Sequence, residues 1–155
     1  DAAAALYEKA IALDSDHEGA TLGLAQIAAE RGDKEKARKL AGAITPGTKE
    51  KAAADALLAK LEFETGCDSN EQKDVLLQRV KDDPNDLDAR FELGRCLAAT
   101  GEYEAALESL LGVIERDKKF RDGAAKDMMV KIFGIVGKRS ELADSYRGKL
   151  ASLLY

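Results

Sequence analysis

The chain has 155 residues, of which 45% are hydrophobic and 34% are charged, and this length can bury one ordinary core. The net charge of −5 argues against nucleic acid or an anionic membrane as the main partner, because both attract basic surfaces. No apolar run approaches the roughly 18 residues of a membrane-spanning helix, so no such helix is predicted.

Turn-forming glycines recur along the chain at a regular spacing. Gly32, Gly66, Gly101 and Gly137 follow one another at intervals of 34, 35 and 36 residues. Repeated turns at this spacing are typical of stacked helical hairpins. Together with breaks near residues 15, 46, 84 and 122, they predict nine helices, over roughly 2–13, 18–31, 33–43, 49–65, 70–82, 87–100, 102–117, 122–136 and 138–154.

The first helix, over 2–13, carries an apolar side with Leu6, Tyr7 and Ile11. A single helix of this length is marginal in water. We therefore expect it to be the second helix of a hairpin whose first helix lies upstream of Asp1. Uncovered Leu6 and Ile11 would allow weak dimerisation, so the expected state is a monomer or a weak dimer.

Residues 14–19 match the opening of a calcium-binding loop, but Ala25 stands where that loop needs a bidentate glutamate. His17 is the only histidine of the chain, so the sequence offers no metal cluster and no Ser-His or Cys-His pair. We expect no catalytic residue, no metal and no cofactor, and interpret the chain as a binding module rather than an enzyme.

The two cysteines, Cys67 and Cys96, are 29 residues apart and form no CxxC motif. Cys67 falls in a predicted turn and Cys96 on a helix, so we expect the first to be exposed and the second to be buried. The prediction is two free thiols in a reducing cytoplasm, with a reactive-thiol role for Cys67 as the alternative.

The most regular stretch runs from Leu87 to Lys118. It carries Leu93-Gly94, Leu97, Gly101, Tyr103, Ala106 and Leu110, a pattern that resembles the tetratricopeptide repeat. The resemblance implies an all-α, right-handed helical solenoid of antiparallel hairpins. Its expected parts are the second helix of a truncated repeat (1–15), three hairpins (16–46, 47–84 and 85–119) and a C-terminal hairpin (120–155).

Solenoids of this kind bind peptides on a concave surface lined by the first helix of each hairpin. The matching positions hold Leu22 and Gln26 in one repeat and Phe91 and Arg95 in another. Repeats that clamp the acidic tails of chaperones carry Lys and Asn there, and here only Arg95 could meet a carboxylate. We therefore expect an apolar groove around Leu22 and Phe91; the alternative is that both are buried between hairpins.

The last forty residues are similar to the C-terminal end of the bacterial thioredoxin-like co-chaperones called chaperedoxins (YbbN/CnoX). The elements that carry this resemblance are Asp117, Asp122-Gly123, Lys126, Ile132-Phe133, Gly137, Tyr146-Arg147, Leu150 and Leu153-Leu154-Tyr155. Members join a thioredoxin-like domain to such repeats, so the resemblance implies that domain upstream of this chain.

The resemblance also implies the partners. Members hold unfolded clients, protect them from oxidation, and pass them to GroEL-type and DnaK-type chaperones. Docking on the chaperonin is expected to use the final helix, through Tyr146, Leu150, Leu153, Leu154 and Tyr155. Three alternatives stay open: the helix end packs as core, the chain is a generic scaffold for one partner peptide, or it positions substrates for an upstream thiol enzyme.

Overall fold

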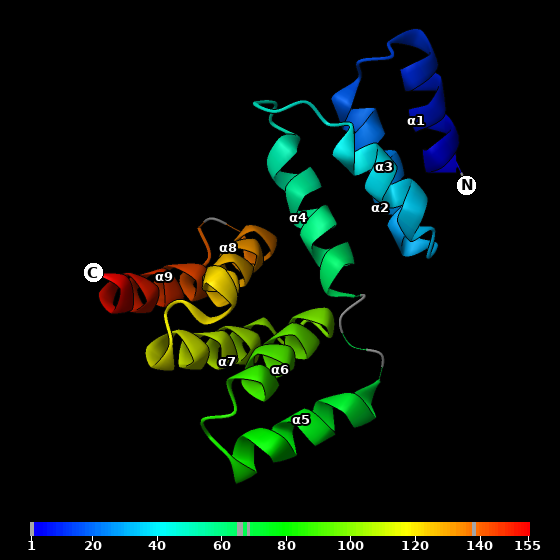
Figure 1. Cartoon of the computed structure of the whole chain (residues 1–155). Coiled ribbons are helices and arrows are strands. Elements are labelled where there is room, and N and C mark those ends of the chain that lie inside the picture. The colour runs from blue at the N-terminus through cyan, green and yellow to red at the C-terminus, as the bar shows by residue number, and fades with distance from the viewer. Residues whose placement is uncertain (1, 65–66, 68, 138) are drawn as a thin grey trace. The chain divides into compact units, whose positions relative to one another are not determined.

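A computed structural model describes residues 2–64, 67, 69–137 and 139–155 of the chain. Within these residues it contains nine α-helices and one short 3-10 helix, η1, and each α-helix confirms a predicted one to within a turn (Figure 1). Every described helix is too short to cross a membrane. The helices are α1 (Ala2–Leu13), α2 (Glu18–Glu30), α3 (Lys34–Gly42), α4 (Lys51–Phe63), α5 (Asn70–Asp82), α6 (Leu87–Ala99), α7 (Tyr103–Arg116), η1 (Phe120–Gly123), α8 (Ala124–Val136) and α9 (Glu141–Leu154).

Several helices begin where a side chain caps their first backbone N–H groups. Asp33, Ser69, Asp86 and Ser140 each accept a hydrogen bond from the N–H three residues along, at 3.1, 3.2, 2.9 and 3.0 Å. The single histidine does the same, since Nδ1 of His17 accepts from the N–H of Ala20 at 3.1 Å. Local capping therefore explains why these elements start where the sequence predicts.

The described glycines that are predicted to form turns have a left-handed backbone. The φ angles of Gly32, Gly101 and Gly137 are 81°, 79° and 99°, a region that side chains with a Cβ rarely adopt. Gly66, the fourth predicted turn glycine, lies outside the described residues.

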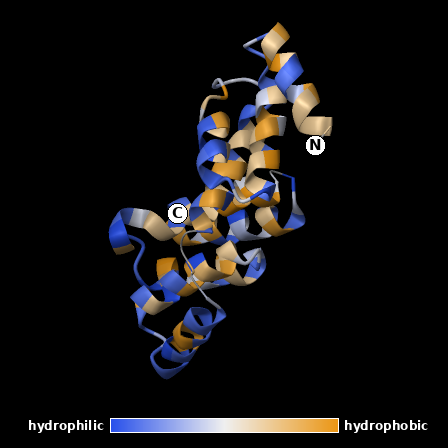
Figure 2. Cartoon of the chain, turned by 90° about the vertical axis from the view of Figure 1, so that its right-hand side faces the viewer, coloured by the Kyte–Doolittle hydropathy of each residue, from blue (hydrophilic) through white to orange (hydrophobic). Residues whose placement is uncertain are grey.

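The described chain divides into two compact units, of which the first is Asp1–Leu61. In it α2 packs on both α1 and α3. Figure 2 shows apolar colour over much of α1, and Leu6 and Leu13 are 65% and 90% exposed. Two apolar clusters join α2, α3 and α4: Ala25, Ala41, Ile44 and Ala54, and next to them Ala28, Ala37 and Leu61.

The second unit, Glu62–Tyr155, is built around α7, which packs on α6, α8 and α9. Leu107 and Leu110 of α7 are fully buried. The approach of α6 is close, because a Cβ on Gly94 would lie 2.8 Å from Cγ of Leu110. Gly94 therefore permits a close helix contact, and a Gly94→Ala substitution would overpack this contact at a cost of about 1–3 kcal/mol.

The helices α4 and α5 have different packing neighbours. The sequence prediction joined them as the hairpin 47–84. In the structure Ala54 and Leu61 of α4 belong to the clusters of the first unit, and α5 packs on α6 in the second unit.

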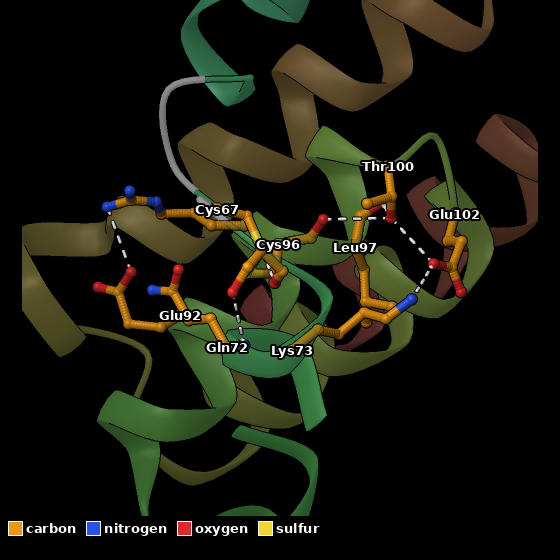
Figure 3. The surroundings of a disulfide bond; sticks show 10 residues. Cys67, Gln72, Lys73, Glu92, Cys96, Leu97, Thr100 and Glu102 are labelled. Carbon is orange, nitrogen blue, oxygen red and sulfur yellow. Dashed lines mark hydrogen bonds and ion pairs between the residues drawn. A yellow bond between two sulfur atoms is a disulfide. The ribbon is translucent and has the colours of Figure 1, made fainter. Parts of the chain in front are cut away.

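The prediction of two free thiols is wrong, because Cys67 and Cys96 form a disulfide with their Cα atoms 4.8 Å apart (Figure 3). The short turn over 83–86 folds α5 back along α6, which brings the start of α5 beside the end of α6. A separation of 29 residues in sequence therefore becomes a direct contact. Cys96 is fully buried as predicted, whereas Cys67 is half-buried rather than exposed. Neither sulfur is a thiol, so the reactive-thiol alternative is also wrong.

A second tie joins the same helix ends. Nζ of Lys73 on α5 lies 2.7 Å from Oε1 of Glu102, which also accepts a hydrogen bond of 2.9 Å from the hydroxyl of Thr100 (Figure 3). The hydrogen bond from Lys73, followed by that from Thr100, holds the pKa of Glu102 below its usual value. The disulfide holds the start of α5 to the end of α6, and the ion pair of Lys73 with Glu102 holds it to the turn between α6 and α7.

Reduction of the disulfide should lower the free energy of unfolding by about 2–4 kcal/mol, because the bond closes a loop with a sequence separation of 29 residues. Guanidinium unfolding of the oxidised chain, with and without dithiothreitol, measures this difference. The Cys67→Ser variant cannot form the bond. Its unfolding midpoint should therefore equal that of the reduced chain and should not change when dithiothreitol is added. Equal unfolding midpoints for the oxidised and reduced chains would contradict the prediction.

Candidate functional site

A groove of about 410 Å³ lies between α6 and α8, beside the end of α4. All of its residues belong to the second unit. We call it the α6–α8 groove. It is lined by Phe91 and Arg95 from α6, by Ala124, Asp127, Met128 and Lys131 from α8, and by Glu62 and Phe63 from α4.

Aromatic side chains form the floor of the α6–α8 groove. Phe63 and Phe91 are only 3% and 4% exposed, so their rings lie beneath the more polar rim. The ring of Phe120 packs beside that of Phe91, with 5.8 Å between their centroids. The side chain of Met128 is half-buried and lines the same groove. The groove therefore combines aromatic rings beneath with polar groups at its rim.

Arg121 fastens the turn before α8 onto α6. Its guanidinium lies 4.9 Å from the centroid of the Phe91 ring, and it pairs with Asp88 at 2.7 Å and with Glu92 at 2.8 Å. The hydrogen bond to Glu92, helped by that to Asp88, raises the pKa of Arg121 above its ordinary value. One arginine thus binds two carboxylates and an aromatic face on the same side of α6.

These contacts hold a backbone that is otherwise unfavourable. Arg121 and Asp122 have φ angles of 45° and 56°, and a left-handed conformation costs a residue with a Cβ roughly 1–2 kcal/mol. The ion pairs and the ring contact of Arg121 offset this cost. Because α8 begins at Ala124, directly after the strained turn, Arg121 sets where α8 starts relative to α6.

The rim of the α6–α8 groove carries paired charges. Lys131 lies 2.7 Å from Glu62, and Arg95 lies 3.2 Å from Glu92. The exposed pair of Lys131 with Glu62 contributes little to stability, so charged groups of a partner can replace it at small cost. An apolar floor under exchangeable charges is an arrangement that suits a polypeptide segment.

The structure places the four predicted groove residues in two units. Phe91 and Arg95 both line the α6–α8 groove, although Phe91 is almost wholly buried. Leu22 and Gln26 lie on α2 in the first unit, where Leu22 packs on the cluster of Ala25 and Gln26 is exposed. Their role in binding stays a prediction.

The predicted docking residues of α9 also differ from one another. Tyr146 and Leu150 are 5% and 7% exposed, and the Tyr146 hydroxyl donates to Oε2 of Glu108 on α7 at 2.7 Å. Leu153 and Leu154 are half-buried, and Tyr155 is fully exposed. The first two residues hold α9 in place, so only the last three are available to a partner.

Sequence reasoning missed six of the eight residues that line the α6–α8 groove. Ala124, Met128 and Lys131 follow helical spacing, so a face of α8 that contains them could have been found. Phe63 and Glu62 gave no such signal. They reach the groove only because the end of α4 belongs to the second unit.

Two family models match the chain, and each is described as a tetratricopeptide repeat. One covers residues 67–155, which is more than half of the chain, and the other covers residues 1–61. The two matches divide in the same region as the two compact units, which part after Leu61. No curated protein matches the chain.

The phenol of Tyr146 should make the free energy of unfolding decrease at alkaline pH. Burial, together with the hydrogen bond to Glu108, raises the pKa of Tyr146 to about 12, above the value of about 10 in an unfolded chain. Folding therefore favours the neutral phenol, and this stabilisation is complete below about pH 10 and is lost as the pH rises towards 12. Guanidinium unfolding at about pH 9 and about pH 11 measures the loss.

The Tyr146→Phe variant should lose less stability between these two pH values than the parent chain. The pKa of Tyr103 is also raised, chiefly by burial. The Tyr103→Phe variant therefore measures how much of the pH dependence comes from this other phenol. An unchanged pH dependence in Tyr146→Phe would show that this phenol does not contribute.

Proposed function

Since the chain belongs to the tetratricopeptide repeat family, and is therefore an all-α helical repeat that mediates protein–protein interaction, we propose that it is the partner-binding region of a co-chaperone. In this role it holds unfolded client proteins and passes them to a GroEL-type chaperonin and to a DnaK-type chaperone. The proposal includes a cytoplasmic location, no catalytic activity in this chain, and a thioredoxin-like domain in the same protein.

The end of α9 is the observation that carries this proposal. The helix is anchored by buried Tyr146 and Leu150, yet it ends in half-buried Leu153 and Leu154 and in fully exposed Tyr155. A solenoid normally ends in a polar capping helix. An apolar end on an anchored helix is therefore suited to insertion into an apolar site of a partner, and residues 116–155 are also those that resemble the chaperedoxins.

Removal of the last three residues should weaken chaperonin binding. A chain that ends at Ser152 keeps Tyr146 and Leu150, so its helical circular dichroism should be unchanged. Full burial of one leucine contributes about 1.5–3 kcal/mol, so we expect affinity for a purified GroEL-type chaperonin to fall at least about tenfold. Isothermal titration calorimetry measures this.

A point variant separates docking from a general loss of apolar surface. Leu154→Ser should also weaken binding, whereas Leu77→Ser, at a leucine of α5 that is 42% exposed, should not. If the full chain does not bind, or if the shortened chain binds equally well, chaperonin docking by α9 is excluded.

A scaffold for one partner segment is the second candidate function, and the α6–α8 groove favours it. Its apolar floor and paired rim charges can hold a peptide whether or not a chaperonin is involved. The two functions differ in what they predict for unfolded proteins, because a scaffold protects them little and a co-chaperone holds them.

Met128→Asp should reduce protection of an unfolded client several-fold, because it places a charge inside the α6–α8 groove. Light scattering of a chemically denatured model enzyme, diluted in the presence of the chain, measures protection. Val130→Asp is the matched control, since Val130 lies on the same helix, is 54% exposed and does not line the groove. No protection by the parent chain would favour the scaffold, and equal protection by both variants would remove the groove from client binding.

A further inference from the structure

The disulfide ties the α6 side of the α6–α8 groove to the segment that follows the end of α4. Cys96 is adjacent in sequence to Arg95, which lines the groove from α6. Cys67 lies four residues after Phe63, which lines the groove from α4. Four residues of chain span at most about 14 Å, so the bond limits how far the Phe63 side can move from α6.

Without the bond, the constraint on this side is weaker. The end of α4 would then be joined covalently to α6 only through the whole of α5, in addition to non-covalent contacts such as the burial of Phe63 and the ion pair of Glu62 with Lys131. That pair is solvent-exposed and contributes little. The disulfide is thus the short covalent restraint on this side of the groove.

The two sulfurs differ in accessibility. Cys96 is fully buried within α6, whereas Cys67 is half-buried in the segment between α4 and α5. An incoming thiolate must reach the sulfur that it attacks along the S–S axis, and access selects which sulfur reacts. Attack on Cys67 with Cys96 as the leaving group is therefore the open route.

We propose that Cys67 is a thiol–disulfide exchange site for a dithiol donor, and that reduction there opens the α6–α8 groove. The groove is the one proposed above to bind a partner segment or a client, and the inference rests on that proposed function only for what the opened groove binds. In the oxidised chain Phe63 and Phe91 are 3% and 4% exposed, so the apolar floor is covered. Reduction frees the Phe63 side and uncovers this floor.

The exchange balances in two steps. A donor thiolate attacks Sγ of Cys67, which forms a donor–Cys67 disulfide and releases Cys96 as a thiolate that takes up a proton. The second thiol of the donor then attacks the mixed disulfide and releases Cys67. Two electrons pass from the donor to the chain, which ends with two thiols while the donor ends as a disulfide.

Glutathione tests the site of attack, because it is a monothiol whose first attack leaves a mixed disulfide that acid quenching traps before a second thiolate can displace it. After brief treatment of the oxidised full chain and acid quenching, peptide mass spectrometry should find glutathione on Cys67 in at least about tenfold excess over Cys96. Equal labelling of the two residues, or labelling mainly on Cys96, would overturn the assignment.

Hydrogen exchange tests the opening without any client, so its outcome does not depend on the proposed function. Treatment with dithiothreitol should lower the protection of amides at 62–64 and 91–95 at least about tenfold, under conditions where helical circular dichroism is kept. The Cys67→Ser variant should show the same low protection with or without reductant.

Gly94→Ala separates a local opening from a general loss of stability. It overpacks the contact of α6 with α7 and leaves the disulfide in place. The oxidised Gly94→Ala chain should keep its protection at 62–64. The same loss of protection in that variant, or no loss in the reduced parent chain, would overturn the proposed opening.

Discussion

The contact between α6 and α7 is the constraint on which the second unit depends. Because position 94 has no Cβ, Leu110 reaches the backbone of α6, and the two helices pack closely along their length. The opposite sides of α7 are also covered, since α8 and α9 pack on it and Val113 and Ile114 are almost fully buried. Because α7 is buried on several sides, the surfaces that can bind a partner lie on the helices around it.

The available surfaces follow from this arrangement. One is the α6–α8 groove, in which Arg121 uses Asp88, Glu92 and the Phe91 ring to hold α8 in place. The other is the end of α9, which Tyr146 anchors to Glu108 of α7. Both surfaces are thus anchored to neighbouring helices, and their exposed residues remain available to partners.

The disulfide changes how the cysteines bear on function. Free thiols would have supported a reducing compartment, and that argument no longer applies now that Cys67 and Cys96 are bonded. The bond instead links α6, which carries Phe91, to the segment that follows Phe63 at the end of α4. The disulfide therefore lies next to residues that line the α6–α8 groove.

The sequence by itself determined the features that depend on neighbouring residues. Capping residues such as Asp86 and left-handed turn glycines such as Gly101 act within one turn of the chain, so the nine α-helices of the described residues and their order were predictable. Helical spacing likewise placed Phe91 and Arg95 on one face, and they line one groove.

Only the tertiary structure decided which distant segments meet. The pairing of Cys67 with Cys96, the left-handed backbone of Arg121 and the presence of Phe63 in the α6–α8 groove each depend on partners 28 or more positions away. The same holds for α9, where contact with α7 buries Tyr146 and leaves Tyr155 exposed. Spacing along one helix shows which residues share a face, but the neighbour that covers the face is set by packing.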